Sequence, residues 1–247
     1  MVINLDEEPC AATPKARIRT HGEAQQVCGG RSVMGVPTAS FVMELFAPNT
    51  FSCPICSGMD RERLVGAYLL RRLGRGFHKS NFRLLEIAPR PSIGNFIKKH
   101  FVVRHQTADM FMKGVDYQIN LSCMPEIESS SCDAWICLHV LEHVPNDQKA
   151  ISELFRILKP SGFGIILVPI SLTLVMTDED PDTSITERWS RFGQDDHIRL
   201  YAKQDFMNRL AKPGFLVRAF GKEYFGEILL KTLGLPLTSV LYVIEKP

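Results

Sequence analysis

The sequence lacks an excess of charge of either sign. Its 247 residues contain 29 Lys and Arg against 27 Asp and Glu, so the formal net charge is only +2. A protein whose whole surface binds nucleic acid or anionic lipid normally carries a clear excess of basic residues. The balance argues against those two classes and favours a small or nearly neutral substrate.

Long apolar runs are also missing. The first twenty residues include three acidic side chains and no continuous apolar stretch, so they do not resemble a secretory signal. The most apolar stretch, residues 228–244, is interrupted by Lys231, Gly234 and Pro236 and is too short to span a membrane. We therefore expect a cytoplasmic protein without a membrane partner.

The seven cysteines form no even framework of pairs, which favours free thiols or metal ligands over disulfides. Cys53 and Cys56 have the spacing of half a zinc site, whereas a closed structural site needs four ligands. Cys28 is a candidate for the third ligand. The candidates for the fourth, none at a persuasive spacing, are Cys10, His21 and His78. We therefore expect no bound metal, with zinc at Cys53 and Cys56 as the alternative.

The chain length suits one large α/β domain with additions. Residues 1–50 show no sustained hydrophobic period, which indicates an N-terminal arm or lid. Residues 51–80 hold the Cys-x-x-Cys pair and a leading helix that Ser57 or Asp60 can cap and Gly74 can end. Residues 81–247 are expected to form the main domain, which a polar segment near residues 171–201 interrupts.

Strand and helix signals alternate from residue 82 onward. Apolar runs typical of buried strands lie at residues 82–88, 101–107, 134–139 and 163–169. A short helix is expected near residues 94–100, and a longer one follows Asn146 and breaks at the Pro-Ser-Gly segment of residues 159–162. This alternation predicts a Rossmann-like α/β fold, a mostly parallel sheet with helices on both faces. Ligands of such sheets bind at the carboxyl ends of the strands.

Polar residues occur at those strand ends. Glu86 lies near the end of the first strand, Asp109 follows the second, and Asn120 lies beyond it. A carboxylate after the second strand can accept hydrogen bonds from both ribose hydroxyls, and an amide can pair with an adenine edge. The pattern predicts a nucleoside-bearing cofactor. A nicotinamide cofactor is an alternative, but it would require Gly-x-Gly-x-x-Gly after the first strand, which the sequence lacks.

Four blocks resemble one known family. They are residues 85–89, 120–125, 132–145 and 153–162, and the most specific piece is His139-Val-Leu-Glu-His143. These blocks resemble the class I S-adenosylmethionine-dependent methyltransferases, in particular the type 11-like group. A subgroup also carries a Cys-Pro-x-Cys element and a Phe-Gly-Gln-x-Asp-His segment, found here at residues 53–56 and 192–201. The resemblance implies a seven-stranded sheet, S-adenosylmethionine as cofactor and S-adenosylhomocysteine as product.

The first loop departs from that family. It runs from Glu86 to Gly94 with Pro89, Pro91 and a single glycine, where relatives are rich in glycine. Glycine permits close backbone approach, whereas proline fixes φ and removes an amide donor. The methionine end of the cofactor must therefore be held differently, or the chain has kept the fold and lost the cofactor. Asn120 is a second departure, because many relatives carry Asp there.

The resemblance implies roles for individual residues. The residues expected to bind the cofactor are Glu86, Ala88, Gly94, Asp109, Asn120, Leu121 and His139. The candidates for catalysis are His143 and His197, because an imidazole can remove a proton near neutral pH. The candidates for binding the acceptor are Glu142, Arg199 and Tyr201, with the segment near residues 171–201 forming the acceptor pocket.

The expected function is methyl transfer from S-adenosylmethionine to an oxygen or nitrogen of a small-molecule acceptor. One alternative is a binding or scaffold protein that kept the fold without the cofactor. Another is methylation of RNA, which the basic residues between Arg61 and Lys79 would favour. Basic residues on helices are usually solvated faces, so nucleic acid is not the expected partner. The sequence sets no oligomeric state.

Overall fold

The computed structural model describes residues 43–45, 52–53 and 57–247. The predicted N-terminal arm, residues 1–50, lies outside the described residues apart from 43–45. The same holds for Cys10, His21, Cys28 and Cys56, so of the candidate zinc ligands only Cys53, which is buried, and His78, which is exposed, are described. The expectation of no metal at these cysteines, and zinc as its alternative, both stay predictions.

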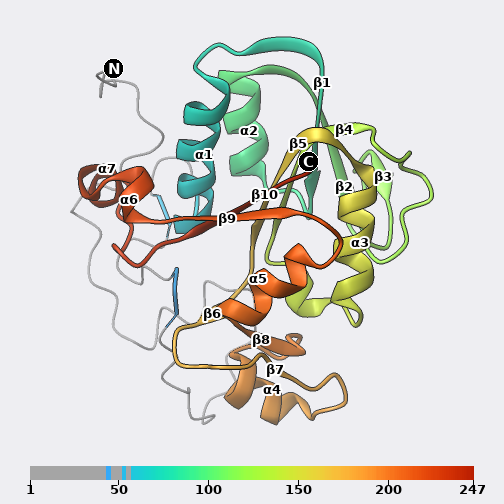
Figure 1. Cartoon of the computed structure of the whole chain (residues 1–247), viewed down its shortest axis with the longest axis vertical. Helices are drawn as coiled ribbons and strands as arrows, with labels where there is room; N and C mark the ends of the chain where they lie inside the picture. Colours follow the sequence, from blue (N-terminus) through green and yellow to red (C-terminus); the bar gives the residue numbers. More distant parts are fainter. Residues whose placement is uncertain (1–42, 46–51, 54–56) are drawn as a thin grey trace.

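A seven-stranded sheet forms the centre of the molecule (Figure 1). Its strands in spatial order are β3 (Tyr117–Gln118), β2 (Val102–Asp109), β1 (His78–Ile87), β4 (Cys132–Leu138), β5 (Leu158–Leu167), β10 (Leu241–Glu245) and β9 (Leu216–Phe220). Every neighbouring pair up to β5 is parallel, and only β10 runs antiparallel to both of its neighbours. The mostly parallel, seven-stranded sheet predicted from the sequence is confirmed.

Two crossover helices set the functional edge of this sheet. Helix α2 (Pro91–His100) joins β1 to β2, and helix α3 (Asp147–Ile157) joins β4 to β5. The two crossovers run in opposite directions along the sheet, so right-handed connections place the two helices on opposite faces. Strand order therefore reverses between β1 and β4, and the crevice at that switch point is where α/β sheets bind ligands.

The remaining helices complete the two layers. Helix α1 (Asp60–Leu73) packs beside α2, and helix α5 (Lys203–Ala211) packs beside α3. Helices α6 (Lys222–Phe225) and α7 (Glu227–Thr232) lie between β9 and β10 in the chain. As predicted, α1 ends at Gly74, and Asn146 caps α3 by accepting a hydrogen bond from the amide of Lys149 at 2.9 Å.

The core lies where the central strands are covered on both faces. Trp135 on β4 is fully buried, and its ring packs against the backbone of Gly164 on β5. A Cβ atom at Gly164 would lie 2.4 Å from that ring, so only glycine fits. Burial on both faces explains why these strands read as continuous apolar runs rather than alternating patterns.

The polar segment after β5 folds into a second, three-stranded sheet. Its strands are β6 (Ile170–Ser171), β8 (Arg199–Ala202) and β7 (Asp178–Glu179), with helix α4 (Ile185–Phe192) between β7 and β8. Ser184 and Glu187 form a capping box at the start of α4. The amide of Ile198 donates to the carbonyl of Glu142 at 3.0 Å, which docks this segment on the loop that follows β4.

Two local expectations are wrong. The helix ends at Ile157 as expected, but the strand expected at residues 163–169 begins earlier, at Leu158, with Ser161 in the left-handed region at φ 62°. The basic residues of α1 were expected to be solvated, but Arg63 is buried and donates to the carbonyls of Leu233 at 2.7 Å and Gly58 at 2.9 Å. Both differences arise from partners distant in the sequence.

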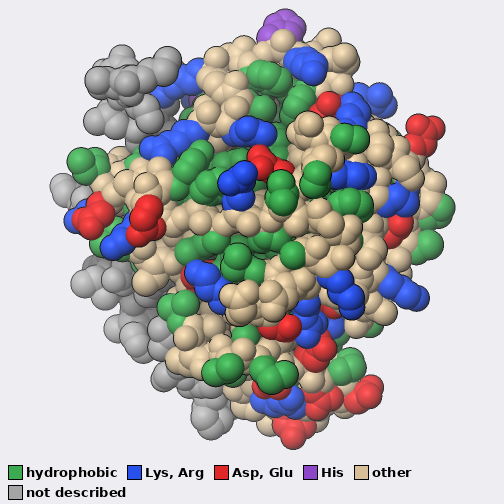
Figure 2. Space-filling model, in the orientation of Figure 1, with side chains coloured by type: hydrophobic (Ala, Val, Ile, Leu, Met, Phe, Trp, Pro, Cys, Tyr) green, Lys and Arg blue, Asp and Glu red, His purple; other side chains and the backbone are tan. Residues whose placement is uncertain are grey.

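The surface agrees with the balanced composition. On the face drawn in Figure 2, basic and acidic side chains are interspersed and form no continuous patch of one sign. Within the described part of the chain, no helix has both the length and the apolar character needed to cross a membrane.

Candidate functional site

The carboxyl ends of β1, β2 and β4 meet at the switch point of the sheet. Ile87 on β1 pairs with Ala108 on β2 and with Cys137 on β4. The residues that leave the sheet there, Ala88 after β1 and His139 after β4, are both left-handed, at φ 51° and 54°. Strained backbone at non-glycine residues is concentrated at ligand sites, because the surrounding structure must hold it in place. Two such residues on adjacent strands mark this edge as the candidate site.

Hydrogen bonds to neighbouring strands hold both of these residues. The amide of Ala88 donates to the carbonyl of Ala108, and the amide of His139 donates to the carbonyl of Leu167, each at 2.8 Å. The backbone therefore changes direction sharply at the ends of two adjacent strands, β1 and β4. Both are among the cofactor-binding residues expected from the sequence.

Glu86 lies beneath the first loop. It is buried, and its carboxylate accepts a hydrogen bond from the amide of Arg90 at 2.8 Å and contacts His105 Nε2 at 2.9 Å. The two oxygens are therefore both engaged inside the protein. In this arrangement Glu86 shapes the loop rather than facing the open edge.

Residues 88–91 of the first loop have no free backbone N–H group. The amides of Ala88 and Arg90 donate to the Ala108 carbonyl and the Glu86 carboxylate, and Pro89 and Pro91 have no amide hydrogen. Gly94 lies inside α2, where its amide donates to the carbonyl of Arg90 at 3.0 Å. This loop therefore offers no backbone donor to a ligand before the second residue of α2.

Asp109 and Asn120 end two neighbouring stretches at the same edge. Asp109 Oδ1 accepts hydrogen bonds from the amides of Phe111 and Met112, both at 2.7 Å, and its Oδ2 makes no hydrogen bond to the described residues. Asn120 is exposed, and its Oδ1 accepts from the amide of Ser122 at 2.9 Å. The amide of Ile119 donates to the carbonyl of Asp109 at 3.0 Å and joins the two loops.

An exposed apolar run follows Asp109. Met110, Phe111 and Met112 are all exposed, and Phe111 shows 80% of its surface. Leu121, by contrast, is buried below the second loop. Sequence reasoning missed this run, although three large apolar residues directly after a strand-terminal carboxylate are the signal that would have found it. Such side chains can cover the flat face of a nucleobase.

Glu142 is the centre of a second group of predicted residues. It lies in a short 3-10 helix, η4 (Leu141–His143), and is fully buried. Its Oε1 lies 3.2 Å from His139 Nδ1 and 4.0 Å from His197 Nε2. Neither carboxylate oxygen has a hydrogen bond of good geometry to a described residue. The structure thus brings together His139, Glu142 and His197, which the sequence analysis assigned to cofactor binding, acceptor binding and catalysis respectively.

Burial and charge act in opposite directions on this carboxyl group. Burial raises the pKa of Glu142, but the contact with His139 and the positive charge of His139, His197 and His143 outweigh it and lower the pKa to about 2. Burial also lowers the pKa of His139 and of His197. Glu142 is therefore an anion at neutral pH, and burial favours the neutral form of the two imidazoles closest to it.

His143 and His197 are held from behind by backbone carbonyls. His143 Nδ1 lies 3.2 Å from the carbonyl oxygen of Asp196, and His197 Nδ1 lies 3.2 Å from that of Phe192. A carbonyl oxygen only accepts, so each Nδ1 carries the proton. Their rings meet edge to face with centroids 4.8 Å apart. His197 is buried, and His143 is half-buried and opens to solvent.

Arg199 and Tyr201 are both buried and face the loop after β4. The guanidinium of Arg199 donates to the carbonyls of Leu141 and Val144, both at 2.6 Å. The hydroxyl of Tyr201 donates to Asp147 Oδ2 at 2.9 Å, and burial raises the pKa of Tyr201 well above its usual value. These two side chains therefore position the loop that carries Glu142 and His143. Direct contact with an acceptor stays a prediction for them.

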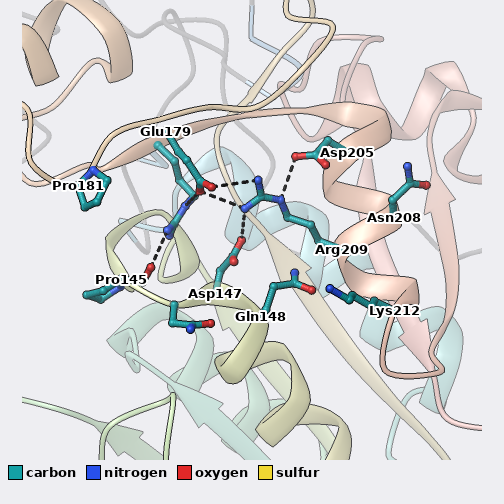
Figure 3. Close-up of a pocket in the computed structure, with 11 residues that line it drawn as sticks. Pro145, Asp147, Gln148, Glu179, Pro181, Asp205, Asn208, Arg209 and Lys212 are labelled. Atoms are coloured by element: carbon teal, nitrogen blue, oxygen red, sulfur yellow. Dashed lines mark hydrogen bonds and ion pairs between the residues drawn. The ribbon is translucent and has the colours of Figure 1, made fainter.

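An open groove of about 560 Å³ lies on the other side of that loop (Figure 3). Its charges are paired, since Arg209 contacts Asp147 at 2.8 Å and Glu179 at 3.1 Å, and Arg199 contacts Glu179 at 2.8 Å. Arg199 is the one predicted site residue in its lining, and the residues expected to bind the cofactor do not contribute. Ion pairs thus hold this groove in shape, and it is separate from the edge of the sheet where the strand ends meet.

Comparison with known proteins gives a match to one family. Residues 98–166 match the family described as "Methyltransferase domain". The matched segment covers less than half of the chain but includes Asp109, Asn120 and the stretch from His139 to His143. No curated protein matches the chain.

Solved structures share the fold at low sequence identity. Phosphoethanolamine N-methyltransferase 2 of Haemonchus contortus, in complex with S-adenosyl-L-methionine, superposes with a TM-score of 0.50 and 16% identity, over 74% of this chain and 52% of that one. This chain thus spans about half the length of that relative. The [4+2]-cyclase SpnF superposes with a TM-score of 0.52 and 13% identity, over 79% of this chain and 84% of that one. Residues 98–166 are therefore similar to a methyltransferase domain, and the described part of the chain has a Rossmann-like α/β fold.

Proposed function

We propose that this chain transfers a methyl group from S-adenosylmethionine to an oxygen or nitrogen of a small-molecule acceptor. The observation that carries the proposal is the arrangement at the switch point. Asp109 lies on one side of the left-handed residues Ala88 and His139, and the group of Glu142, His143 and His197 lies next to His139. A site for a nucleoside cofactor and a site for a reacting group are thus adjacent. The segment similar to a methyltransferase domain includes Asp109, His139, Glu142 and His143, whereas Ala88 and His197 lie outside it.

The residues present fit such a cofactor. Asp109 keeps Oδ2 available for ribose hydroxyls because its Oδ1 alone holds the loop amides. Asn120 exposes its amide group, and the apolar run after Asp109 can cover an adenine face. His139 closes the site on the β4 side. These roles support cofactor binding by the residues that the sequence analysis assigned.

The methionine end needs a different solution from the glycine-rich loops of relatives. Backbone amides of residues 88–91 are used internally or absent, so a side chain must replace them. Arg90 is the cationic side chain on this loop, with 38% of its side chain exposed and its Nε 3.8 Å from Glu62 Oε1. A guanidinium can bind a carboxylate with two parallel hydrogen bonds. Arg90 is therefore the residue we assign to the carboxylate of the methionine end.

The protein's own contribution to the reaction is positioning. When bound, S-adenosylmethionine supplies a methyl group on a positively charged sulfur. The chain's residues must hold an acceptor atom in line with that group and remove a proton where the acceptor is a hydroxyl or an amine. The Nε2 atoms of His143 and His197 present lone pairs on the acceptor side, because each Nδ1 carries the proton. The segment of residues 171–201 forms the roof over these atoms.

A small acceptor is favoured over RNA by the charges. Basic and acidic side chains are interspersed on the face of Figure 2, and Arg63 of the basic stretch is used inside the fold. A non-catalytic binding protein is the second candidate, because the first loop lacks free amides. The cyclase among the structural neighbours is a reminder that this fold also serves other reactions.

Calorimetry on the full-length chain tests the proposal. Titration with S-adenosylhomocysteine, S-adenosylmethionine and NAD should give saturable binding of the first two and no binding of NAD. Arg90→Gln should weaken S-adenosylhomocysteine binding, while Arg104→Gln, an exposed basic residue on β2, should leave it unchanged. No heat with either sulfur compound, in folded protein, would leave only the binding-protein alternative.

The acceptor side is tested separately. His143→Ala and His197→Ala should leave the affinity for S-adenosylhomocysteine nearly intact and lower turnover, by roughly 10²- to 10⁴-fold for a residue that takes part in proton removal. If both substitutions abolish cofactor binding and leave turnover per bound cofactor unchanged, these two histidines belong to the cofactor shell instead.

A further inference from the structure

Glu142 poses a problem of charge that the proposed function does not solve. Its side chain is fully buried, and neither carboxylate oxygen has a well-aligned hydrogen bond to a described residue. A buried carboxylate is costly unless hydrogen bonds, a charge or a metal ion compensate it, and the contact with His139 Nδ1 at 3.2 Å engages only one of the two oxygens. The groups around Glu142 therefore indicate which kind of positively charged ligand could compensate it.

The side chains around Glu142 that could bind a cation lie close together. The ligand atoms of Glu142, His143 and His197 all lie within 4.8 Å of one another. His197 Nε2 lies 4.0 Å from Glu142 Oε1. The Nδ1 atoms of both histidines face backbone carbonyls, so in the neutral ring the proton lies on Nδ1 and the Nε2 lone pair is available to a cation. One nitrogen of each imidazole and a carboxylate oxygen of Glu142 lie close enough together to share one ion.

We propose that Glu142, His143 and His197 bind a divalent transition-metal ion. A cation at their centre would satisfy all three groups at once. The carbonyls of Asp196 and Phe192 would act as the outer partners that fix the tautomer and the orientation of metal-binding histidines. His139 Nδ1, 3.2 Å from Glu142 Oε1, contacts the carboxylate from outside this group of three.

The geometry requires only a small closure. Ligands about 2.0 to 2.1 Å from a tetrahedral zinc ion lie roughly 3.3 Å apart. The largest separation here, 4.8 Å, therefore shrinks by about 1.5 Å on binding. His143 can supply most of that movement, because its side chain is 34% exposed and its loop is short. His197 and Glu142 are held by the packed interior and define the fixed part of the site.

The donor set selects the kind of metal. Two imidazoles with one carboxylate suit zinc, iron, cobalt or nickel, whereas Mg²⁺ and Ca²⁺ prefer sites built from oxygen ligands. Three protein ligands also leave coordination positions open. In terms of the proposed function, on which this step rests, an oxygen or nitrogen of the acceptor would occupy an open position next to the methyl donor. The metal ion, rather than the Nε2 atoms of His143 and His197, would then promote its deprotonation. Metal binding itself rests on the geometry alone.

The sequence analysis found no complete set of metal ligands because it considered the cysteines. Glu142 and His143 are adjacent in the chain, but His197 comes from the second sheet's segment, more than fifty residues later. The docking of Ile198 on the carbonyl of Glu142 brings His197 to the site. Only the folded chain reveals that the three groups share one point.

The test uses the full-length protein, stripped with a chelator and titrated with Zn²⁺ and with Co²⁺ by calorimetry, with Mg²⁺ as a comparison. We expect one equivalent of Zn²⁺ or Co²⁺ at this site. Glu142→Gln, which keeps the shape of the side chain, and His143→Ala should each weaken that equivalent by at least 10-fold. Glu128→Gln, which removes an exposed carboxylate outside the site, should bind as the wild type does.

Cobalt absorbance separates this site from the cysteines. Co²⁺ bound by imidazole and carboxylate shows visible bands without the near-ultraviolet thiolate band, and Cys53→Ser should not change them. Circular dichroism and thermal unfolding establish that each variant is folded. If Glu142→Gln does not fold, the half-exposed His143→Ala carries the test.

Three results would overturn the proposal. The first is metal stoichiometry and affinity that do not change in Glu142→Gln and His143→Ala. The second is binding of Mg²⁺ without Zn²⁺ or Co²⁺. The third is metal-free protein whose ¹⁵N spectrum shows His197 protonated on both nitrogens and which binds no metal, so that an imidazolium compensates Glu142. S-adenosylhomocysteine binding, measured on the same samples, reports on the proposed function separately, since a metal-binding chain that ignores this ligand would refute the latter alone.

Discussion

The substitution Asp109→Asn gives a sharp test of the cofactor site. The two carboxylate oxygens of Asp109 have separate tasks, because Oδ1 holds the amides of Phe111 and Met112 at 2.7 Å each and Oδ2 is left over. An amide oxygen can still accept from both backbone amides, so the loop should keep its shape. The NH₂ group that replaces Oδ2 donates and carries no charge, so the charge-assisted bonds to ribose hydroxyls should vanish.

The expected loss is about 1 to 3 kcal/mol of binding free energy, because hydrogen bonds to a charged group contribute about 1.5 to 3 kcal/mol and a neutral partner recovers part of this. The dissociation constant of S-adenosylhomocysteine, measured by calorimetry, should therefore rise roughly 5- to 150-fold. The free energy of unfolding should change by less than about 0.5 kcal/mol, as for a substitution that breaks no local contact. Asp109→Ala should show the same loss of affinity together with a loss of stability.

A matched control is available at the other end of the same loop, between β2 and β3. Asp116 also organises backbone, since its Oδ2 accepts from the amide and the hydroxyl of Thr107, both at 2.8 Å, and its side chain is exposed. Asp116→Asn should leave the affinity for S-adenosylhomocysteine unchanged. Unaltered affinity in folded Asp109→Asn would refute the assignment of Asp109 to the ribose. An equal loss in both variants would show a general effect of the loops.

The remaining predictions concern stability. Gly164→Ala would place a Cβ atom 2.4 Å from the Trp135 ring, so the free energy of unfolding should fall by about 1 to 3 kcal/mol and the melting temperature with it. Arg199→Lys should cost about 2 to 4 kcal/mol in urea unfolding, because one ammonium cannot satisfy the carbonyls and carboxylate that the buried guanidinium serves. The hydrogen bond from Arg156 lowers the pKa of Glu153, so this group stabilises the fold above its unfolded pKa of about 4.3 and the contribution is lost as the pH falls through the lower folded value. Glu153→Gln should therefore flatten the acid side of a plot of unfolding free energy against pH.

Each of these has a control. Gly94→Ala places its Cβ 3.6 Å from the nearest atom, in His105, so it should be neutral or stabilising by up to about 1 kcal/mol. Arg191→Lys affects a partly exposed pair and should cost under about 1 kcal/mol. Glu128→Gln removes an exposed carboxylate and should leave the acid side unchanged. Equal effects of a test variant and its control would contradict the reasoning for that residue.

The order of strands and helices could be predicted because it is written in local patterns. Apolar runs gave the central strands, Asn146 marked the start of α3, and Gly74 marked the end of α1. The start of β5 could not be predicted, because pairing of Leu158 with Cys132 on the neighbouring strand overrides the turn tendency of Pro-Ser-Gly. Local sequence contains no information on such a partner.

The candidate site was predictable in its parts and not in its assembly. Glu86, Asp109 and Asn120 were found from their positions after strands, and all lie near the predicted edge. That both oxygens of Glu86 are engaged internally depends on His105, a residue of the neighbouring strand. The burial of Arg199 and Tyr201, and their bonds to the loop after β4, likewise follow from how the second sheet docks. Spacing along the chain cannot report these distances.

The hydrogen bonds from Arg199 to the loop after β4 limit how the acceptor specificity of this protein can be changed. The segment of residues 171–201, which we propose covers the acceptor, also supplies the guanidinium that holds Leu141 and Val144, and the histidine that faces Glu142. Replacing this segment with the corresponding segment of another protein would therefore remove Arg199, which holds the loop, together with His197. New specificity should arise more readily from single substitutions at exposed positions of this segment, such as Val175 and Met176, than from transplanting the segment whole.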